Sequence, residues 1–204
     1  MKARERILKA AAEQFYKTGY PATGVGDILK VAEAHKASFY KYFKNKEELG
    51  LAYITAKRRL YANLFRSLMK AYPRYADFVN QWINILKAEA GKGNVSGCAF
   101  ALLYNQTLIS RSRSTEAIFL PEIQGGIQDW ETIFFEYLME NLKRKRKARR
   151  ISSREETSLR QWARRMVLLY EGALQAYAMT GKEIYFEDLR DCLLMAPILS
   201  GRAA

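Results

Sequence analysis

Residues 23–43, TGVGDILKVAEAHKASFYKYF, read as two short helices joined by a tight turn. Apolar and aromatic side chains recur at helical spacing on both sides of that turn. They are Ile28, Leu29, Val31 and Ala32 in the first helix and Phe39, Tyr42 and Phe43 in the second. Small, hydroxyl and basic side chains lie between the aromatic ones, on faces that can point away from the core. This pattern is typical of a helix-turn-helix, whose second helix enters the major groove and whose Lys and Tyr side chains suit phosphate and base-edge contacts.

A dense set of sequence markers surrounds this stretch, from residue 4 to residue 54. They are Ile7-Leu8, the spacing of Ala11 and Phe15, Gly19-Tyr20, Ala22-Thr23, Asp27-Ile28, Ser38-Phe39-Tyr40, Tyr42-Phe43 and Lys46-Glu47-Glu48-Leu49. With these markers the run resembles the N-terminal domain of the TetR family of transcriptional regulators. The resemblance covers about a quarter of the chain. A shorter segment, GCAFALLYN at 97–105, is similar to the start of a helix in one subgroup of that family.

The resemblance implies a DNA-contacting role for particular side chains. Lys36 and Ala37, at the start of the second helix, would meet base edges as a donor to guanine and as a partner of the thymine methyl group. Tyr40 matches a family tyrosine that hydrogen-bonds a phosphate, and Lys46 matches a lysine that reaches one. Thr23 is placed to cap the first helix of the pair, and in the family the residue at this cap contacts a phosphate through its hydroxyl. The expected DNA-binding set is Thr23, His35, Lys36, Ala37, Ser38, Tyr40, Lys41, Tyr42 and Lys46.

The turn itself departs from the family pattern. Glu33 stands where the family usually carries glycine. A non-glycine residue in the left-handed conformation costs about 1–2 kcal/mol, so either the turn has another geometry or the domain tolerates strain. His35 occupies the capping position of the second helix. Its ring has three candidate roles: a cap, a contact with phosphate or base, and, when charged at lower pH, an electrostatic aid to DNA binding.

The composition favours a polyanionic partner. The chain has 204 residues, a formal net charge of +13 and a pI of about 9.7. A basic excess of this size favours nucleic acid first and an anionic membrane second, while a plain solvated basic surface is the alternative. No apolar run reaches the roughly 18 residues that span a bilayer, and the N-terminus lacks the apolar core of a signal peptide. We therefore expect a cytoplasmic protein with no membrane partner.

Residues that support catalysis or metal binding are scarce. The chain has two cysteines, Cys98 and Cys192, neither of them in a CxxC pair, and a single histidine, His35. A zinc site is therefore not expected, nor is any cofactor. No Gly-rich phosphate loop or Ser-elbow motif occurs, and we predict that the protein is not an enzyme. Both cysteines lie among apolar residues, which favours buried packing; a redox switch is the alternative.

Helical periodicity continues over the rest of the chain, and no segment alternates as a strand does. Besides the pair at 23–43, the expected helices are 3–18, about 45–71, 74–90, 98–110, a long one from 115 or 121 to 146, 152–180 and 185–195. Gly125-Gly126 is expected to kink the long helix or to allow close helix contact. We predict an all-α fold, with an N-terminal three-helix domain carrying the helix-turn-helix at 1–46 and a larger helical ligand-binding and dimerisation domain at 47–204.

Aromatic and aliphatic residues of the second domain can form the walls of a cavity for a small organic ligand. The expected ligand-binding residues are Tyr61, Phe65, Phe78, Trp82, Phe100, Tyr104, Ile123, Ile127 and Trp130. An aromatic stripe at helical spacing is more often the ordinary packing of a core, and the expectation of a pocket follows mainly from the family resemblance. The effector that this interpretation implies is small and apolar or aromatic.

The helix predicted at 152–180 is apolar nearly all round, so it must be buried on both sides. The simplest arrangement packs one side on its own domain and the other on a second subunit. In the family the last two long helices pair across a twofold axis as a four-helix bundle. The expected dimerisation residues are Trp162, Met166, Leu169, Tyr170, Ala173, Tyr177, Leu189 and Leu193.

Residues 143–150, KRKRKARR, carry seven basic side chains in eight positions. A solvated connection is the simpler interpretation, because cations are favoured beside a helix C-terminus. Contact with nucleic acid, an anionic effector or a protein partner is the alternative.

Together these features predict a homodimeric TetR-like regulator of transcription. The resemblance implies a repressor that a small organic ligand releases from a pseudo-palindromic site on double-stranded DNA. The alternative is a helix-turn-helix DNA-binding protein regulated by a protein partner, with no small-molecule effector. Ligand-dependent release of DNA distinguishes the two.

Overall fold

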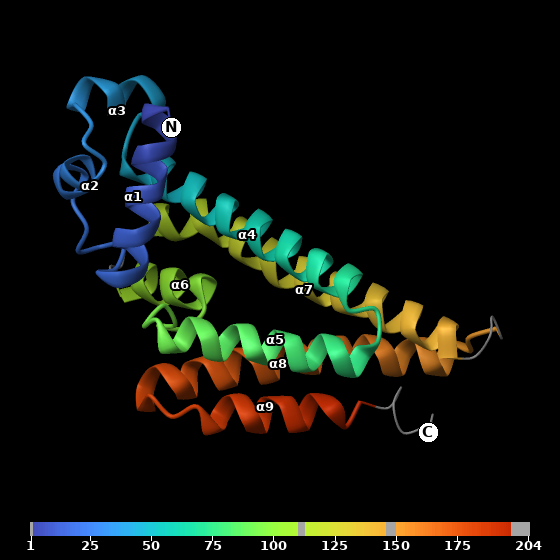
Figure 1. The fold of residues 1–204 in the computed structure, drawn as a ribbon. Coiled ribbons are helices and arrows are strands. Elements are labelled where there is room, and N and C mark those ends of the chain that lie inside the picture. The colour runs from blue at the N-terminus through green and yellow to red at the C-terminus, as the bar shows by residue number, and fades with distance from the viewer. Residues whose placement is uncertain (1, 110–112, 146–149, 197–204) are drawn as a thin grey trace. The chain divides into compact units, whose positions relative to one another are not determined.

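The computed structural model describes residues 2–109, 113–145 and 150–196. Over these residues the chain is helical and contains no strand (Figure 1). The helices are α1 (Ala3–Lys17), α2 (Val25–Val31), α3 (Lys36–Tyr42), α4 (Lys46–Ala71), α5 (Tyr75–Gly91), α6 (Ala99–Ile109), α7 (Arg113–Lys145), α8 (Ser153–Thr180) and α9 (Ile184–Leu194). The predicted all-α fold is confirmed, and the predicted helices match the observed ones closely. The middle of the basic run, 146–149, lies outside the described residues.

By its packing the chain divides into two compact units. The first comprises Met1–Leu60 and Cys98–Gly126, and the second comprises Tyr61–Gly97 and Ile127–Ala204. The long helices α4 and α7 therefore contribute residues to both units. The helix-turn-helix shares its unit with α6 and the first part of α7. The functional boundary predicted after residue 46 stays a prediction.

In the first unit, α1 packs against α2 and α3, which lie together in Figure 1. Ile7 of α1, Ile28 of α2 and Phe39 of α3 have no exposed surface. Val31, which the sequence assigned to the apolar face of α2, is instead 49% exposed. Successive helical residues turn by about 100°, so Val31 lies roughly 110° from the centre of the arc between Ile28 and Leu29. The buried arc of this short helix is too narrow to include Val31.

The turn between α2 and α3 adopts the left-handed conformation that its sequence makes costly. Glu33 has a φ of 49°. Its N–H and the next one donate to carbonyl oxygens in the last turn of α2, at 3.3 and 3.0 Å, which is the Schellman pattern of a helix end. From α1, the Arg6 guanidinium donates to the Ala32 carbonyl oxygen at 3.1 Å and to the Glu33 carbonyl oxygen at 3.2 Å. The domain therefore tolerates the strain, because hydrogen bonds from both sides hold the turn.

Glycine at position 33 is expected to stabilise the protein. The substitution removes the strain of a non-glycine residue in the left-handed conformation, about 1–2 kcal/mol. Against this, the greater conformational freedom of glycine in the unfolded chain lowers stability by about 0.5–1 kcal/mol. Glu33→Gly should therefore raise the free energy of unfolding by about 0.5–1 kcal/mol in urea titrations followed by circular dichroism. Glu33→Ala keeps the left-handed cost and should give no gain. An equal gain in stability from both variants would mean that the Glu33 side chain, and not the left-handed backbone, destabilises the wild-type protein.

The loop between α1 and α2 differs from the prediction at the cap of α2. Gly19, with a φ of 97°, lies just after the end of α1 in the left-handed conformation that glycine adopts readily. The N-cap of α2 is Gly24 rather than Thr23, and its N–H donates to Asp27 Oδ2 at 3.1 Å. The Thr23 hydroxyl donates instead to the Gly19 carbonyl oxygen at 2.7 Å, and the residue is 2% exposed. Thr23 thus closes the loop by a bond back to the chain just after α1, and its hydroxyl does not cap α2.

Gly125 and Gly126 lie within α7, which continues as a helix through the pair. A Cβ at Gly126 would lie 2.5 Å from the Phe100 ring of α6, and one at Gly125 would collide with the Arg58 guanidinium of α4. Arg58 also pairs with Glu122 of α7 at 3.4 Å. Close helix contact, one of the two effects predicted for the glycine pair, is therefore observed.

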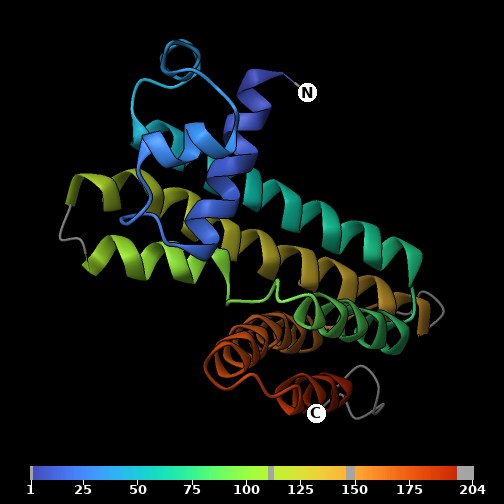
Figure 2. The ribbon, with the colours of Figure 1, turned by 60° about the vertical axis from the view of Figure 1, so that its left-hand side comes forward.

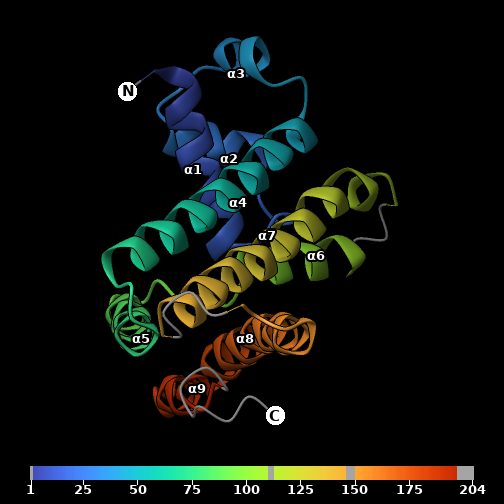
Figure 3. The same ribbon diagram turned by 90° about the vertical axis from the view of Figure 1, so that its right-hand side faces the viewer.

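In the second unit, α9 packs against α5 and α8, and Figures 2 and 3 show α8 and α9 side by side. The buried Tyr75 hydroxyl of α5 donates to the Leu193 carbonyl oxygen at 3.0 Å and accepts from Trp162 Nε1 of α8 at 3.2 Å. An ion pair of 2.8 Å between Lys87 and Glu187 adds a second link from α5 to α9 and lowers the pKa of the Glu187 carboxyl. Polar contacts therefore join α9 to α5 at two points, and α5 in turn to α8.

The two ends of α8 follow the sequence signals. The Ser152 hydroxyl accepts from the Glu155 N–H at 3.3 Å, and the Glu155 carboxylate accepts from the Ser152 N–H at 2.9 Å. This is a capping box, in which each residue satisfies an N–H group of the other. Gly181, with a φ of 68°, ends the helix. The limits of α8 are thus set locally.

Candidate nucleic-acid interface

Helix α3 turns one side to the core and the other to solvent. Phe39 is fully buried, and its ring centre lies 5.8 Å from that of Phe43, just after the helix. Tyr40, on the other side, is 55% exposed. Four more of the predicted DNA-binding residues are exposed beside it: His35, Lys36, Ala37 and Lys41. The buried aromatic anchors therefore hold the predicted DNA-contacting side outward.

Three predicted residues of the turn and of α3 have less simple positions. His35 is the N-cap of α3, but its ring makes no capping hydrogen bond, so the first of its candidate roles is not observed. Ser38 and Tyr42 are half-buried. Lys41 Nζ lies 5.8 Å from the centre of the Tyr42 ring, within the range of a cation–π contact. Their contacts with DNA stay a prediction.

Lys46, at the start of α4, is directed at the loop before α2. Its ammonium donates to the carbonyl oxygens of Thr23 at 3.0 Å and Pro21 at 3.4 Å, and it lies 4.5 Å from the centre of the Tyr20 ring. Burial lowers the pKa of Lys46 below its usual value, and the opposing effect of the nearby Glu47 is smaller. Lys46 and Thr23 both hold this loop, so their predicted phosphate contacts are not favoured by the packing and stay predictions.

Tyr20 is the centre of a junction that the sequence reasoning did not identify. Its ring meets the Phe119 ring of α7 edge-on at 5.1 Å between centres. A Cβ at Gly50 of α4 would lie 2.8 Å from the Tyr20 ring and 2.6 Å from the Phe119 ring, so only glycine fits there. The Tyr20 N–H donates to Gln106 Oε1 of α6 at 2.8 Å. The loop that leads into the helix-turn-helix is thus held by α4, α6 and α7.

One local signal for this junction was present in the sequence. Gly50 interrupts the apolar pattern of α4, and a glycine inside a helix costs about 1 kcal/mol relative to alanine, which suggests a close approach. Nothing local marks Gln106 or Phe119 as its partners. Gln106 bonds to a backbone group 86 residues away, and such a contact follows only from the fold.

Removing the Tyr20 hydroxyl is expected to stabilise the first unit. Among the described residues it is buried without a hydrogen-bond partner, and burial, with Glu47, raises the pKa of Tyr20 well above its usual range. Tyr20→Phe should raise the free energy of unfolding by about 1 kcal/mol in urea titrations. Tyr75→Phe is the matched control and should lower it by about 1–3 kcal/mol, because the Tyr75 hydroxyl makes two buried hydrogen bonds. Loss of stability in both variants would reveal a partner for Tyr20.

The nine predicted ligand-binding residues are divided between the two units. Three belong to the first unit: Phe100, Tyr104 and Ile123. Six belong to the second unit: Tyr61, Phe65, Phe78, Trp82, Ile127 and Trp130. Four of these six are buried aromatic residues with ring centres 5.1–5.8 Å from a neighbour in the set. These rings pack as a core, the alternative that the sequence left open, and a ligand-binding role stays a prediction.

The predicted dimerisation residues face the interior of the protomer. Six are at most 9% exposed: Trp162, Met166, Tyr170, Ala173, Leu189 and Leu193. Leu169 and Tyr177 are half-buried. A helix that is apolar nearly all round offers two sides, and periodicity does not tell which one meets its own core. Burial within the protomer therefore does not favour these residues as a subunit interface, and dimerisation stays a prediction.

Membrane crossing and metal binding are the two other properties considered for the residues that the structure describes. No helix there is both long and apolar enough to cross a membrane. No group of three or more His, Cys, Asp or Glu side chains is arranged there to hold a metal ion.

Comparison with known proteins adds independent findings. The family described as "Bacterial regulatory proteins, tetR family" matches residues 7–53. The uncharacterized HTH-type transcriptional regulator YxaF of Bacillus subtilis (strain 168) is 30% identical over 142 residues, which cover 68% of this chain and 71% of YxaF. The HTH-type transcriptional repressor NemR of Escherichia coli (strain K12) is 29% identical over 97 residues, 47% of this chain and 49% of NemR. The crystal structure of the reduced form of E. coli NemR is similar in fold, with a TM-score of 0.74 and 20% identity over 96% of this chain and 97% of that one.

The helix-turn-helix with its exposed basic side, in an all-α chain, defines the class: a DNA-binding transcriptional regulator. The matching relatives belong to the same class. The chain is a member of the TetR family.

Proposed function

We propose that this protein is a transcriptional repressor that binds a pseudo-palindromic DNA site through α3 of two subunits. The observation that carries the proposal is the exposed side of α3, where Lys36, Tyr40 and Lys41 lie away from the buried Phe39. Guanine presents acceptors to a lysine in the major groove, and phosphates accept from tyrosine and lysine side chains. The similarity to NemR, a transcriptional repressor, supports repression as the sign of the regulation. We assign no reaction to the protein.

Two substitutions on α3 are expected to separate base readout from phosphate binding. Lys36→Ala should cost about 1–3 kcal/mol on the specific site and relax the base preference at one position of each half-site. Tyr40→Phe should weaken binding to specific and random DNA alike, because a phosphate contact carries no sequence information. Fluorescence anisotropy at fixed salt measures both, after a selection experiment has supplied the specific site.

Lys182→Ala is the charge-matched control for these variants, because Lys182 is an exposed lysine of the second unit. Its affinity for DNA should be that of the wild-type protein. If Lys36→Ala lowers the affinity for all DNA sequences equally, Lys36 contacts a phosphate and does not read a base. Wild-type affinity in both α3 variants would sink the assignment of α3 as the recognition helix.

We propose that a second subunit packs on the exposed apolar side of α8 and α9. Leu168 and Met179 of α8 are each 70% exposed, and Gly172 lies between them on the same side. At the two ends of α9, Ile184 is 51% exposed and Met195, just after the helix, is 74% exposed. Exposed apolar side chains gathered on one side are typical of surfaces that another protein covers. A twofold pair of this kind would present two α3 helices to half-sites about 34–36 Å apart.

A bulky charge at residue 172 is expected to break this dimer without disturbing the protomer. A Cβ at Gly172 meets no atom within 4 Å, so Gly172→Arg fits the isolated subunit. The variant should sediment as a monomer in analytical ultracentrifugation and bind the palindromic site far more weakly. Gly91→Arg is the matched control, because a Cβ at Gly91, at the end of α5, is also free of contacts within 4 Å. A dimeric Gly172→Arg variant would move the subunit interface elsewhere.

A small organic effector is proposed to lower the affinity for DNA through α6 and α7. Gln106 of α6 and Phe119 of α7 contact Tyr20, in the loop before α2. A shift of either helix therefore displaces the start of the helix-turn-helix. The effector acts only through its different affinities for the two states. The alternative is a protein partner with no small-molecule signal, and release of DNA by a small molecule alone distinguishes the two.

A further inference from the structure

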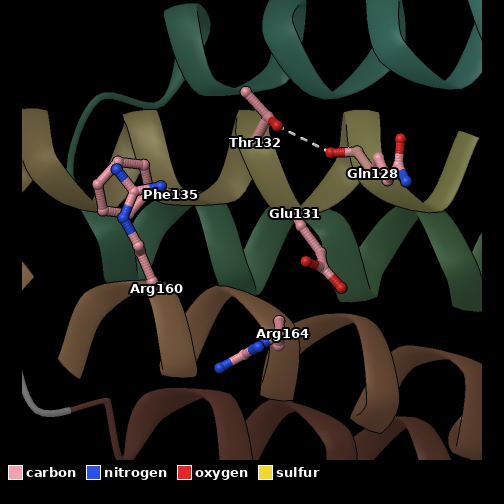
Figure 4. A pocket seen from close by; sticks show the side chains of 6 residues that line it. All are labelled: Gln128, Glu131, Thr132, Phe135, Arg160 and Arg164. Carbon is pink, nitrogen blue, oxygen red and sulfur yellow. Dashed lines mark hydrogen bonds between the residues drawn. The ribbon is translucent and has the colours of Figure 1, made fainter. Parts of the chain in front are cut away.

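A cleft of about 280 Å³ lies between α7 and α8 of the second unit (Figure 4). We call it the α7–α8 cleft, and its lining residues are Gln128, Glu131, Thr132, Phe135, Arg160 and Arg164. None of the residues predicted to bind an effector lines it. Its volume is near the lower end of the range of ligand sites, about 300–1,000 Å³, so it suits a small molecule.

One end of the α7–α8 cleft has a fixed wall made by an arginine on an aromatic ring. The Arg160 guanidinium carbon lies 3.9 Å from the centre of the Phe135 ring, and Figure 4 shows the two side chains meeting across the cleft. Arg160 Nη2 also pairs with Glu156, one turn earlier on α8, at 2.8 Å. The Glu156 carboxylate therefore offsets part of the Arg160 charge, and the guanidinium lies against the Phe135 ring at this end of the cleft.

The remaining two charges of the cleft are of opposite sign and do not meet. Glu131 projects from α7 toward α8 in Figure 4, and Arg164 lies on α8 one turn after Arg160. Among the described residues neither Glu131 nor Arg164 has an ion-pair partner within 4.0 Å. Both line the same cleft, so its width keeps a carboxylate and a guanidinium apart and leaves each with unused hydrogen-bonding capacity.

The polar side chains beside Glu131 add acceptors rather than another cation. The Thr132 hydroxyl donates its proton to the Gln128 carbonyl oxygen at 2.8 Å, the bond drawn in Figure 4. Its lone pairs remain able to accept a hydrogen bond, as the Gln128 side-chain amide oxygen also can. A ligand therefore meets a donor of charge-assisted hydrogen bonds on α8 and a group of acceptors on α7.

We propose that the α7–α8 cleft binds a small zwitterion of the amino acid class with an apolar side chain. The carboxylate of the ligand accepts from Arg164, and its ammonium donates to Glu131 and to the Thr132 hydroxyl. The apolar side chain lies against the flat surface of Arg160 and Phe135. A plain anion is disfavoured because Glu131 faces the same space and Arg160 is already paired. This proposal concerns binding alone and does not rest on the proposed regulation of DNA binding.

Isothermal titration of the full-length protein with three probes tests the proposal. The probes are L-phenylalanine, 3-phenylpropanoate, which lacks the ammonium, and 2-phenylethylamine, which lacks the carboxylate. L-Phenylalanine should bind saturably, and each truncated probe should bind roughly tenfold or more weakly, because each loses charge-assisted hydrogen bonds. No saturable binding of L-phenylalanine, or equal binding of all three probes, would overturn the zwitterion assignment.

Variants of the two unpaired charges locate the site. Arg164→Gln should weaken L-phenylalanine to the level of 2-phenylethylamine, and Glu131→Gln should weaken it to the level of 3-phenylpropanoate. Arg154→Gln, at another exposed arginine of α8, is the matched control and should leave binding unchanged. Circular dichroism confirms that each variant is folded. Unchanged binding in both cleft variants would place the ligand elsewhere.

Sedimentation of the same variants tests the rival use of the cleft. Arg164 precedes Leu168 by one turn, so it lies beside the proposed subunit interface, and α9 carries acidic residues that a partner could insert. The proposal predicts that Arg164→Gln remains dimeric. A monomeric Arg164→Gln variant, together with no binding of L-phenylalanine to the wild-type protein, would make the cleft a subunit contact and overturn the proposal.

Discussion

The packing of Tyr20 is the constraint on which the first unit depends. Its ring lies 5.0 Å from the Phe15 ring of α1 and 5.1 Å from the Phe119 ring of α7. The Tyr20 and Phe119 rings fit beside α4 only because residue 50 is glycine. The backbone at the same residue is held by Gln106 of α6. Helices from distant parts of the chain therefore meet at one side chain. This contact explains why α6 and the start of α7 belong to the compact unit of the helix-turn-helix.

The direction of the exposed side of α3 is set by the packing and hydrogen bonds around the helix-turn-helix. Phe39 anchors the helix, and the turn before it is held in a left-handed conformation at Glu33 by the end of α2 and by Arg6. A glycine would enter this conformation more readily, but the hydrogen bonds around the turn are sufficient to impose it on glutamate. The orientation of the exposed side of α3 thus depends on the buried Phe39 ring and on the hydrogen bonds that hold the turn at Glu33.

The second unit shows how one residue type serves two purposes. Its aromatic side chains at helical spacing pack against one another, with the rings of Phe65 and Trp82 5.1 Å apart, and they form a core. The cleft between α7 and α8 is lined instead by charged and polar residues around a single ring, Phe135. The residues predicted to bind a ligand from their apolar character therefore lie in the core. The cleft instead carries two opposite charges, Glu131 and Arg164, that do not form an ion pair.

The sequence by itself determined the helices, both ends of α8 and the helix-turn-helix, because helical periodicity, the Ser152 capping box and the glycines after helices are local signals. It also indicated the basic side of α3, since Phe39 must point inward and its neighbours must not. Only the tertiary structure decided that Thr23 closes a loop instead of capping α2, that α8 turns Met166 inward and Leu168 outward, and that Arg164 and Glu131 share a cleft. The physical reason is that the pattern of apolar and polar residues predicts which side chains are buried. It does not predict the partner that covers each of them, because that partner comes from a part of the chain far away in sequence.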